Sequence, residues 1–397
     1  MSFPTRPLLA AIAAAMLAAP GAAPAAESPP PTSGAAALVV DARTGAVMHA
    51  VSGGRARPIA SATKLMTALL TLERVEDLDE MVRAAPYSAS AVESKIGLVA
   101  GERMTVRDLL TALLLESAND AAVTLAVRVG GSREAFVREM NRRAVELGLG
   151  DTSYANPIGF DDPENHSSAR DLAALARRLL GNREFARIVD LPQATLTTGA
   201  RTRVIDNRNR LVRTYPFVSG VKTGHTQGAR YVLVGSGATG GARVITVTMG
   251  APSEAARDAD TLALLRWGLE QFRRVRVVRR GRPLARVDVR WHDGQAAVGA
   301  ARPVTLLLRT GQRTSTVVDA PDELEGPLDA GERVGWVDVR RGGRTVRRVP
   351  LVTLAEVEGA SFTRKVVRSG GWALTAVALL GIVLAAMLVV RRRRRQR

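Results

Sequence analysis

The stretch Pro58-Ile59-Ala60-Ser61-Ala62-Thr63-Lys64-Leu65-Met66-Thr67 places a serine and a lysine three residues apart at the expected start of a helix. The residues from Lys64 onward are good helix formers with apolar positions at helical spacing. Residues three apart on a helix share one face, so the Lys64 amine can reach the Ser61 hydroxyl. A serine becomes a nucleophile when a neighbouring base removes its proton. The alternative interpretation is a helix cap followed by a solvated lysine.

The basic residues of the chain are almost all arginine. The formal net charge is +18, and only four of the 56 basic residues are lysines: Lys64, Lys95, Lys222 and Lys365. Arginine does not give up its proton in a protein, whereas a desolvated lysine can. Lysine at Lys64 therefore favours a chemical role. The positive charge is spread along a chain with few aromatics, which argues against nucleic acid and favours an anionic surface, membrane lipid or cell wall.

Composition also limits the cofactor chemistry that we expect. The chain has no cysteine, which excludes disulfides, thiol catalysis and zinc–cysteine sites. The four histidines (His49, His166, His225 and His292) lack the spacing of metal ligands, so we expect neither a metal nor another cofactor. A length of 397 residues allows about two to three domains.

Both ends of the chain predict export and membrane attachment. Residues 1–26 have the basic start, apolar centre and small-residue end of a signal peptide, and the proline-containing stretch 27–35 is a linker. Residues 372–390 are 19 uncharged, mostly apolar residues, which predicts a transmembrane helix. Arginines dominate the tail 391–397, so this tail is expected in the cytoplasm and the rest of the chain outside the membrane.

Hydrophobic patterns predict two domains between these ends. Residues 36–274 combine a hairpin over 37–51 with a mainly helical middle over 72–189 and late antiparallel strands, an α/β (α+β) domain with a helical subdomain. The clearest elements are expected helices at 106–115, 121–129, 169–180 and 258–272, and strands at 231–234 and 244–247. Residues 275–358 contain short strands between Gly, Asp and Pro turns, a small all-β domain, and 359–371 is a linker.

Three short motifs follow one another in the first domain: Ser61-x-x-Lys64, Ser117-x-Asn119 and Lys222-Thr223-Gly224. The second lies in Glu116-Ser117-Ala118-Asn119-Asp120, a polar loop between two apolar helices. By itself that loop is also compatible with a capping turn in which Asn119 or Asp120 is the cap. The ordered set is typical of class A β-lactamases and penicillin-binding proteins.

Longer stretches around these motifs and at 167–171 and 220–226 make the chain resemble the low-molecular-mass penicillin-binding proteins of the D-alanyl-D-alanine carboxypeptidase type. The resemblance implies a penicillin-binding/β-lactamase-like transpeptidase domain. It further implies a serine peptidase that removes the terminal D-alanine of peptidoglycan stem peptides through an acyl-enzyme. β-Lactam antibiotics are expected to bind the same serine.

This chemistry predicts a role for each residue of the motifs. Ser61 attacks the carbonyl between the two D-alanines, and Lys64 is the base, with its pKa lowered by burial or by the charge of Lys222. Ser117 passes a proton to the leaving amine. Asn119 holds the substrate amide and Lys64.

The substrate-binding residues are expected along Lys222-Thr223-Gly224-His225-Thr226, whose strand edge can pair with an extended peptide. The resemblance implies an oxyanion hole made by the backbone N–H groups of Ser61 and His225. It also implies that Arg257 binds the free carboxylate of the substrate. The alternative for Arg257 is a surface arginine on a helix. A Ser-His-Asp arrangement through His225 lacks the G-x-S-x-G elbow.

Three other functions stay open at the level of sequence. A D,D-endopeptidase would need a cleft for a longer leaving group. A β-lactamase is disfavoured by Ala118, the β domain and the predicted membrane segment. A non-catalytic wall-binding scaffold is disfavoured by the intact motifs.

Overall fold

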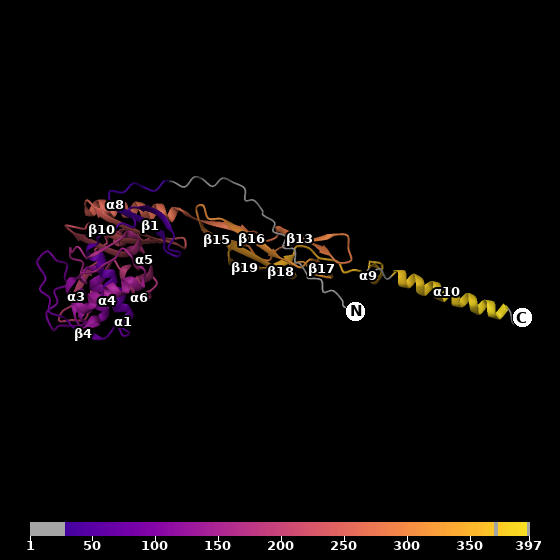
Figure 1. Cartoon of the computed structure of the whole chain (residues 1–397), viewed down its shortest axis with the longest axis horizontal. Helices are drawn as coiled ribbons and strands as arrows, with labels where there is room; N and C mark the ends of the chain where they lie inside the picture. Colours follow the sequence, from indigo (N-terminus) through magenta and orange to yellow (C-terminus); the bar gives the residue numbers. More distant parts are fainter. Residues whose placement is uncertain (1–27, 369–371, 395–397) are drawn as a thin grey trace, which may run out of the picture. The chain divides into compact units, whose positions relative to one another are not determined.

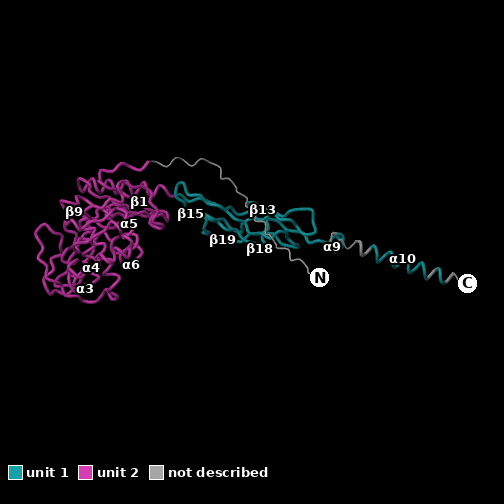
Figure 2. Tube along the Cα trace, in the orientation of Figure 1, with its two compact units in different colours: residues 1–24, 273–397 teal, residues 25–272 magenta. Residues whose placement is uncertain are grey.

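The computed structural model describes residues 28–368 and 372–394. The chain divides into two compact units, one over Ala25–Phe272 and the other containing Arg273–Arg397 (Figure 2). The predicted signal peptide, 1–26, lies outside the described residues, as do 369–371 and 395–397.

A five-stranded antiparallel sheet forms the centre of the first unit (Figure 1). Its order is β2-β1-β11-β10-β9, and every neighbouring pair is antiparallel, as the sequence predicts. The strands are β1 (Ala36–Asp41), β2 (Val47–Val51), β9 (Val218–Thr226), β10 (Arg230–Thr239) and β11 (Ala242–Ala251). The last two extend well beyond the predicted strands 231–234 and 244–247.

Helices cover both faces of this sheet, and as a result every residue of β1 is buried. Val39 faces Gly268 of α8 (Glu254–Glu270), where an added Cβ would lie 2.9 Å from the valine. Leu38 and Val40 face α5 (Ala169–Leu179). Helix α8 begins four residues before the predicted 258–272, because the Ser253 hydroxyl accepts a hydrogen bond from the Ala256 N–H and caps it.

The helical subdomain packs around α2 and α3, whose apolar residues are almost all buried. Its elements are the 3₁₀ helix η1 (Ala60–Thr63), α1 (Lys64–Arg74), α2 (Val106–Leu115), α3 (Asn119–Gly130), α4 (Arg133–Glu146), α6 (Arg183–Val189) and α7 (Arg210–Thr214). The predicted helix start is present, but its first turn is a 3₁₀ helix. Ser61 lies in this turn, where Ala60 has a left-handed φ of 47°, and the α-helix begins at Lys64.

Three small ribbons were not predicted from sequence: β3 (Arg57–Pro58) with β6 (His166–Ser167), β4 (Met81–Arg83) with β5 (Arg103–Thr105), and β7 (Gln193–Leu196) with β8 (Arg203–Asp206). Each strand has two to four residues and few apolar side chains. A pattern of period two is too short to detect over such lengths.

The second unit is rich in β-structure, as predicted. Its main sheet has the order β16-β18-β19-β14-β13-β17, and β12 pairs with β15. The strands are β12 (Phe272–Val278), β13 (Pro283–Val289), β14 (Gln295–Ala300), β15 (Val304–Arg309), β16 (Thr314–Asp319), β17 (Glu323–Leu324), β18 (Arg333–Arg341) and β19 (Arg344–Thr353).

Two helices follow this sheet. The predicted linker 359–371 contains α9 (Phe362–Arg368), which starts where the Ser361 hydroxyl accepts from the Arg364 N–H at 3.4 Å. Helix α10 (Trp372–Arg394) covers the predicted transmembrane segment 372–390. Among the residues that the structure describes, no helix combines the length and the apolar character needed to cross a membrane.

Candidate active site

Ser61 and Lys64 are in direct contact. The Lys64 amine lies 3.1 Å from Ser61 Oγ. It also donates to Asn119 Oδ1 at 2.7 Å and to the Ile158 carbonyl at 2.5 Å. A neutral amine has two N–H donors and one lone pair, so these two acceptors direct the lone pair at the Ser61 hydroxyl. This geometry suits a base that removes the serine proton.

The surroundings of Lys64 lower its pKa well below the ordinary value. Burial is the largest cause, since the side chain is wholly inaccessible to solvent, and the positive charge of Lys222 acts in the same direction. The carboxylates of Glu93 and Asp120 oppose this effect. Both causes that the sequence suggested for a neutral Lys64 are therefore present.

Two glycines allow the backbone around Ser61 to pack closely. A Cβ on Gly224 of β9 would lie 3.1 Å from the Ser61 nitrogen. A Cβ on Gly159, whose φ is 95°, would lie 2.0 Å from the Ala60 carbonyl oxygen. Glycine thus brings β9 beside the Ser61 N–H, the region in which the oxyanion hole is predicted.

The second motif lies at the start of α3. Asn119 is the first helical residue and Ala118 is the N-cap, with no side-chain capping bond, so the alternative of Asn119 or Asp120 as a cap is wrong. Ser117 has a left-handed φ of 64° and is buried. In the part of the chain that the structure describes, its hydroxyl has no hydrogen-bond partner. It therefore remains available to a substrate.

Glu93 belongs to the site, although the sequence gave no indication of it. Its carboxylate accepts from Asn119 Nδ2 at 2.8 Å and from the Tyr87 hydroxyl. Burial raises the pKa of Glu93, but the hydrogen bonds from Tyr87 and Asn119 outweigh it and lower the pKa to about 2. Because the anion accepts from the Asn119 amide nitrogen, the amide oxygen is turned toward Lys64.

Lys222 lies on β9 and is also buried, at 1% exposure. Burial, reinforced by the positive charges of Arg208 and Arg257, lowers the pKa of Lys222 to about 7. Its amine donates to the Thr223 carbonyl at 3.0 Å. The two buried lysines of the site are thus both easier to deprotonate than a lysine in water.

The remaining β9 residues differ in what they contact. Thr223 is buried, and Thr226 donates to Asp161 at 2.6 Å, which ties the strand end to the 156–163 turn. The His225 ring is exposed and stacks on Tyr231 at 4.1 Å between centroids. No hydrogen bond joins it to Ser61 within the described residues, so a Ser-His pair is not formed there.

Arg257 lies in α8 with its side chain only 4% exposed, which contradicts the alternative of a surface arginine. It forms ion pairs with Asp258 at 2.7 Å and Glu254 at 3.1 Å. These contacts use its Nε and one terminal nitrogen. Its role toward a substrate carboxylate remains a prediction.

No group of three or more metal-ligating side chains comes together within the described residues.

Comparison with known proteins supports this interpretation. The family model for D-alanyl-D-alanine carboxypeptidases matches residues 23–253. This chain belongs to that family. A second model, the C-terminal domain of penicillin-binding protein 5, matches residues 272–359. The protein is a serine-type D-alanyl-D-alanine carboxypeptidase, with a penicillin-binding/β-lactamase-like domain followed by a β-rich domain.

Individual relatives match this chain over most of its length. The D-alanyl-D-alanine carboxypeptidase DacF of Bacillus subtilis is 30% identical over 85% of this chain and 89% of its own length. The D-alanyl-D-alanine carboxypeptidase DacD of Escherichia coli is 33% identical over 82% of this chain and 88% of its own length. The solved structure of penicillin-binding protein 5 from Haemophilus influenzae has 27% identity and a TM-score of 0.59, covering 84% of this carboxypeptidase and 99% of that chain.

Proposed function

We propose that this carboxypeptidase removes the terminal D-alanine from peptidoglycan stem peptides through an acyl-enzyme on Ser61. Neutral Lys64 takes the Ser61 proton while the serine oxygen attacks the carbonyl between the two D-alanines. The oxygen–carbon bond forms, and the negative charge on the carbonyl oxygen is held by the N–H groups of Ser61 and His225. Ser117 then delivers a proton to the departing D-alanine amine.

Hydrolysis of the acyl-enzyme completes the reaction. Water attacks the ester carbonyl, Lys64 accepts its proton, and Ser61 Oγ leaves and is reprotonated. In this proposal Lys222 and Arg257 attract the terminal carboxylate, and the edge of β9 pairs with the peptide backbone. A β-lactam ring presents a carbonyl to Ser61 in the same way, so penicillins are expected to form a stable ester there.

The single observation that carries this proposal is the buried Lys64 amine, 3.1 Å from Ser61 Oγ and fixed by two acceptors. A capping serine with a solvated lysine, the alternative from sequence, would leave the amine in water.

The test is release of free D-alanine from a pentapeptide ending in D-alanyl-D-alanine. The wild-type chain is expected to release one D-alanine per peptide, and Ser61→Ala none. Equal release by the variant would contradict the assignment of Ser61.

We further propose that the enzyme acts outside the cytoplasm and near membrane lipid. The apolar segment 372–390 and the arginines after it support this, together with the signal-like residues 1–26. Fractionation of cells that produce the full chain tests it: recovery in the cytosolic fraction would contradict it.

A further inference from the structure

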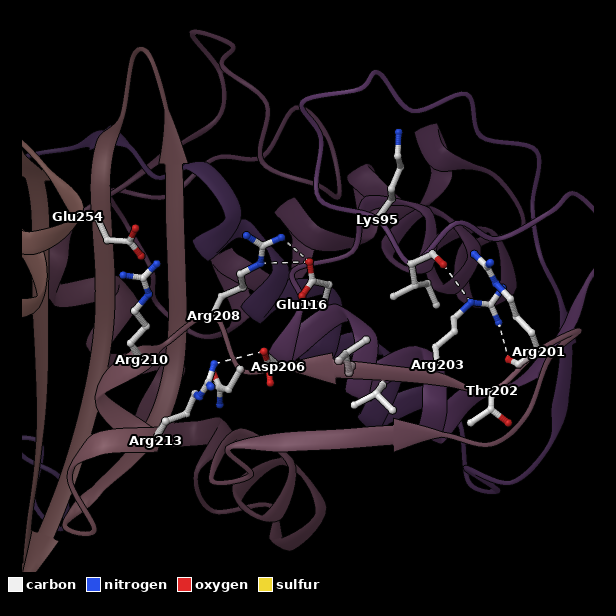
Figure 3. A pocket seen from close by; sticks show the side chains of 14 residues that line it. Lys95, Glu116, Arg201, Thr202, Arg203, Asp206, Arg208, Arg210, Arg213 and Glu254 are labelled. Carbon is white, nitrogen blue, oxygen red and sulfur yellow. Dashed lines mark hydrogen bonds and ion pairs between the residues drawn. The ribbon is translucent and has the colours of Figure 1, made fainter.

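The first unit has a surface pocket of about 160 Å³ between α5 and the β1–β2 hairpin. It shares no lining residue with the larger pocket of about 690 Å³ along β8, which adjoins the active site at Glu116 (Figure 3). A cavity of this smaller size has room for one apolar side chain. Small or apolar side chains form much of its lining: Leu38, Val40, Val47, Ala173 and Ala174.

Strand β2, at one side of this pocket, is the edge strand of the five-stranded sheet. It pairs with β1, and no strand among the described residues lies on its other side. Val47 and Val51 of this strand are 39% and 41% exposed. An edge strand presents backbone N–H and C=O groups with which a further strand can pair. Strand β2 is therefore open to β-augmentation.

Two arginines of α5 lie at the two ends of β2. A Cβ on Gly45, two residues before the strand begins, would lie 3.2 Å from Arg177 Nε. A Cβ on Gly54, three residues after the strand ends, would lie 3.8 Å from Arg170 Nε. The Arg170 backbone N–H also donates to the Gly53 carbonyl at 2.9 Å. Helix α5 thus runs antiparallel to β2, with one guanidinium group near each end of the strand.

Neither of these guanidinium groups has an anionic partner in the part of the chain that the structure describes. Arg170 and Arg177 are exposed and form no ion pair there, whereas the next arginine of α5, Arg178, pairs with Glu73 at 3.2 Å. Ala174 lies between the two arginines on the same helical face, where its small side chain leaves the space between them open. Two unpaired guanidinium groups beside an apolar pocket favour a ligand with carboxylates.

The spacing of the two arginines fits an extended peptide. Seven residues of an α-helix advance about 10 Å along its axis. In a β-strand, residues four apart lie on one face and are separated by about 13 Å. The long arginine side chains can span this difference. A strand added to β2 therefore places two carboxylates, four residues apart, near Arg170 and Arg177, with the side chain between them over the pocket.

Other occupants of this surface fit it less well. Outside the described residues the chain contains one acidic residue, Glu27, so its own missing segments do not supply the two carboxylates. A second copy paired through β2 would bring two pairs of arginines together, and like charges repel. The chain has a net charge of +18, which favours a partner of opposite charge.

We propose that this surface binds an extended acidic segment of a partner protein by β-augmentation. We call it the edge site, and it consists of β2, the pocket beside α5, Arg170 and Arg177. The segment that it recognises has the pattern acidic-x-apolar-x-acidic. Strands β2 and β9 form opposite edges of the sheet, so a partner bound at the edge site leaves the β9 edge free for substrate.

The test measures the binding of a synthetic peptide to the full chain in detergent, by fluorescence anisotropy. The peptide has seven residues, with valine at its centre, glutamate two positions to either side and threonine elsewhere. The edge-site variant is Arg170→Gln with Arg177→Gln. Its matched control is Arg83→Gln with Arg138→Gln, which removes the same charge from exposed positions of β4 and α4. The rate of penicillin acylation reports that each variant is folded.

We expect the wild type and the control to bind the peptide with the same Kd, and the Kd to rise about tenfold in the edge-site variant. Replacing both glutamates of the peptide by lysine should abolish binding.

Two N-methylated peptides separate backbone pairing from attraction between charges. Only every second N–H of a strand faces a given neighbour. Methylation of one alternate set of amides should therefore abolish binding, and methylation of the other set should leave it intact.

Absence of peptide binding to the wild type would overturn this inference, as would an unchanged Kd in the edge-site variant. Equal binding of both N-methylated peptides would show that no strand pairing occurs and would also overturn it. A wild-type dimer in sedimentation that the edge-site substitutions alter would assign the surface to a second copy instead. All these outcomes leave release of D-alanine unaffected, so the carboxypeptidase chemistry is tested separately.

Discussion

The two units of this protein differ in which charged side chains they bury and in what those side chains contact. The catalytic unit buries Lys64, Lys222 and Arg257, whereas among the described residues of the β-rich unit only Asp338 is a buried charged residue. Asp338 accepts hydrogen bonds from Nε and one terminal nitrogen of Arg348, at 2.7 and 2.9 Å. Lys64 instead contacts Ser61, the proposed nucleophile, and its pKa is well below the ordinary value. A buried ionisable group whose charge is not fully balanced by partners therefore indicates a functional residue.

The largest expected effect is that of Lys64→Arg. Arginine keeps the positive charge but cannot give up its proton, so Ser61 loses its base. We expect acylation by penicillin to slow by about 10²–10⁴-fold, the usual contribution of general base catalysis. Stopped-flow measurement of acylation checks this, and a variant that reacts at the wild-type rate would show that Lys64 is not the base.

A smaller but still large effect is expected for Lys222→Arg. The lysine side chain is buried beside Thr223, and the wider guanidinium does not fit the same space. We expect kcat/KM for the pentapeptide to fall by about 10²-fold. Wild-type turnover by this variant would mean that positive charge alone is needed at this position.

Glu93→Gln tests the contact that holds Asn119. Loss of the carboxylate weakens the bond from Asn119 Nδ2, and kcat/KM should fall about tenfold. A nearby negative charge raises the pKa of a lysine, so its removal lowers the pKa of Lys64 further. Neutral Lys64 then forms at lower pH.

The ascending limb of the pH profile of kcat/KM should accordingly move toward acid in Glu93→Gln. Glu134→Gln, an exposed change on α4, provides the control and should leave the limb in place. If kcat/KM falls but the ascending limb of the pH profile stays in place, Glu93 has a structural role and does not set the pKa of Lys64.

The smallest effect is expected in the β-rich unit. Asp338→Asn removes the ion pair with Arg348, which is half exposed, and should lower the free energy of unfolding by about 1 kcal/mol or less. Turnover of the soluble pentapeptide should not change. Calorimetry and the D-alanine assay measure the two quantities, and a loss of turnover would mean that this unit contributes to catalysis.

The sequence predicted the site best at positions where the proposed reaction requires one particular residue type. The ordered motifs identified the five residues that the fold brings to one region, and the scarcity of lysine supported the assignment of the two lysines. These residues are Ser61, Lys64, Ser117, Asn119 and Lys222. The sheet and the helical subdomain followed from long periodic segments.

What sequence missed depends on contacts between distant segments. Glu93 reaches Asn119 across 26 residues of separation through a loop without periodicity. The β7–β8 ribbon has strands of four residues with little apolar alternation. The 3₁₀ turn at Ser61 depends on the left-handed Ala60, a residue type that gives no such signal.

The central claim is that Ser61, activated by Lys64, is the nucleophile. The most direct measurement is the mass of the intact protein after reaction with penicillin, followed by mapping of the modified peptide. The account predicts one adduct per chain, on Ser61, and none in Ser61→Ala. An adduct on another residue, or one that persists in Ser61→Ala, would contradict it.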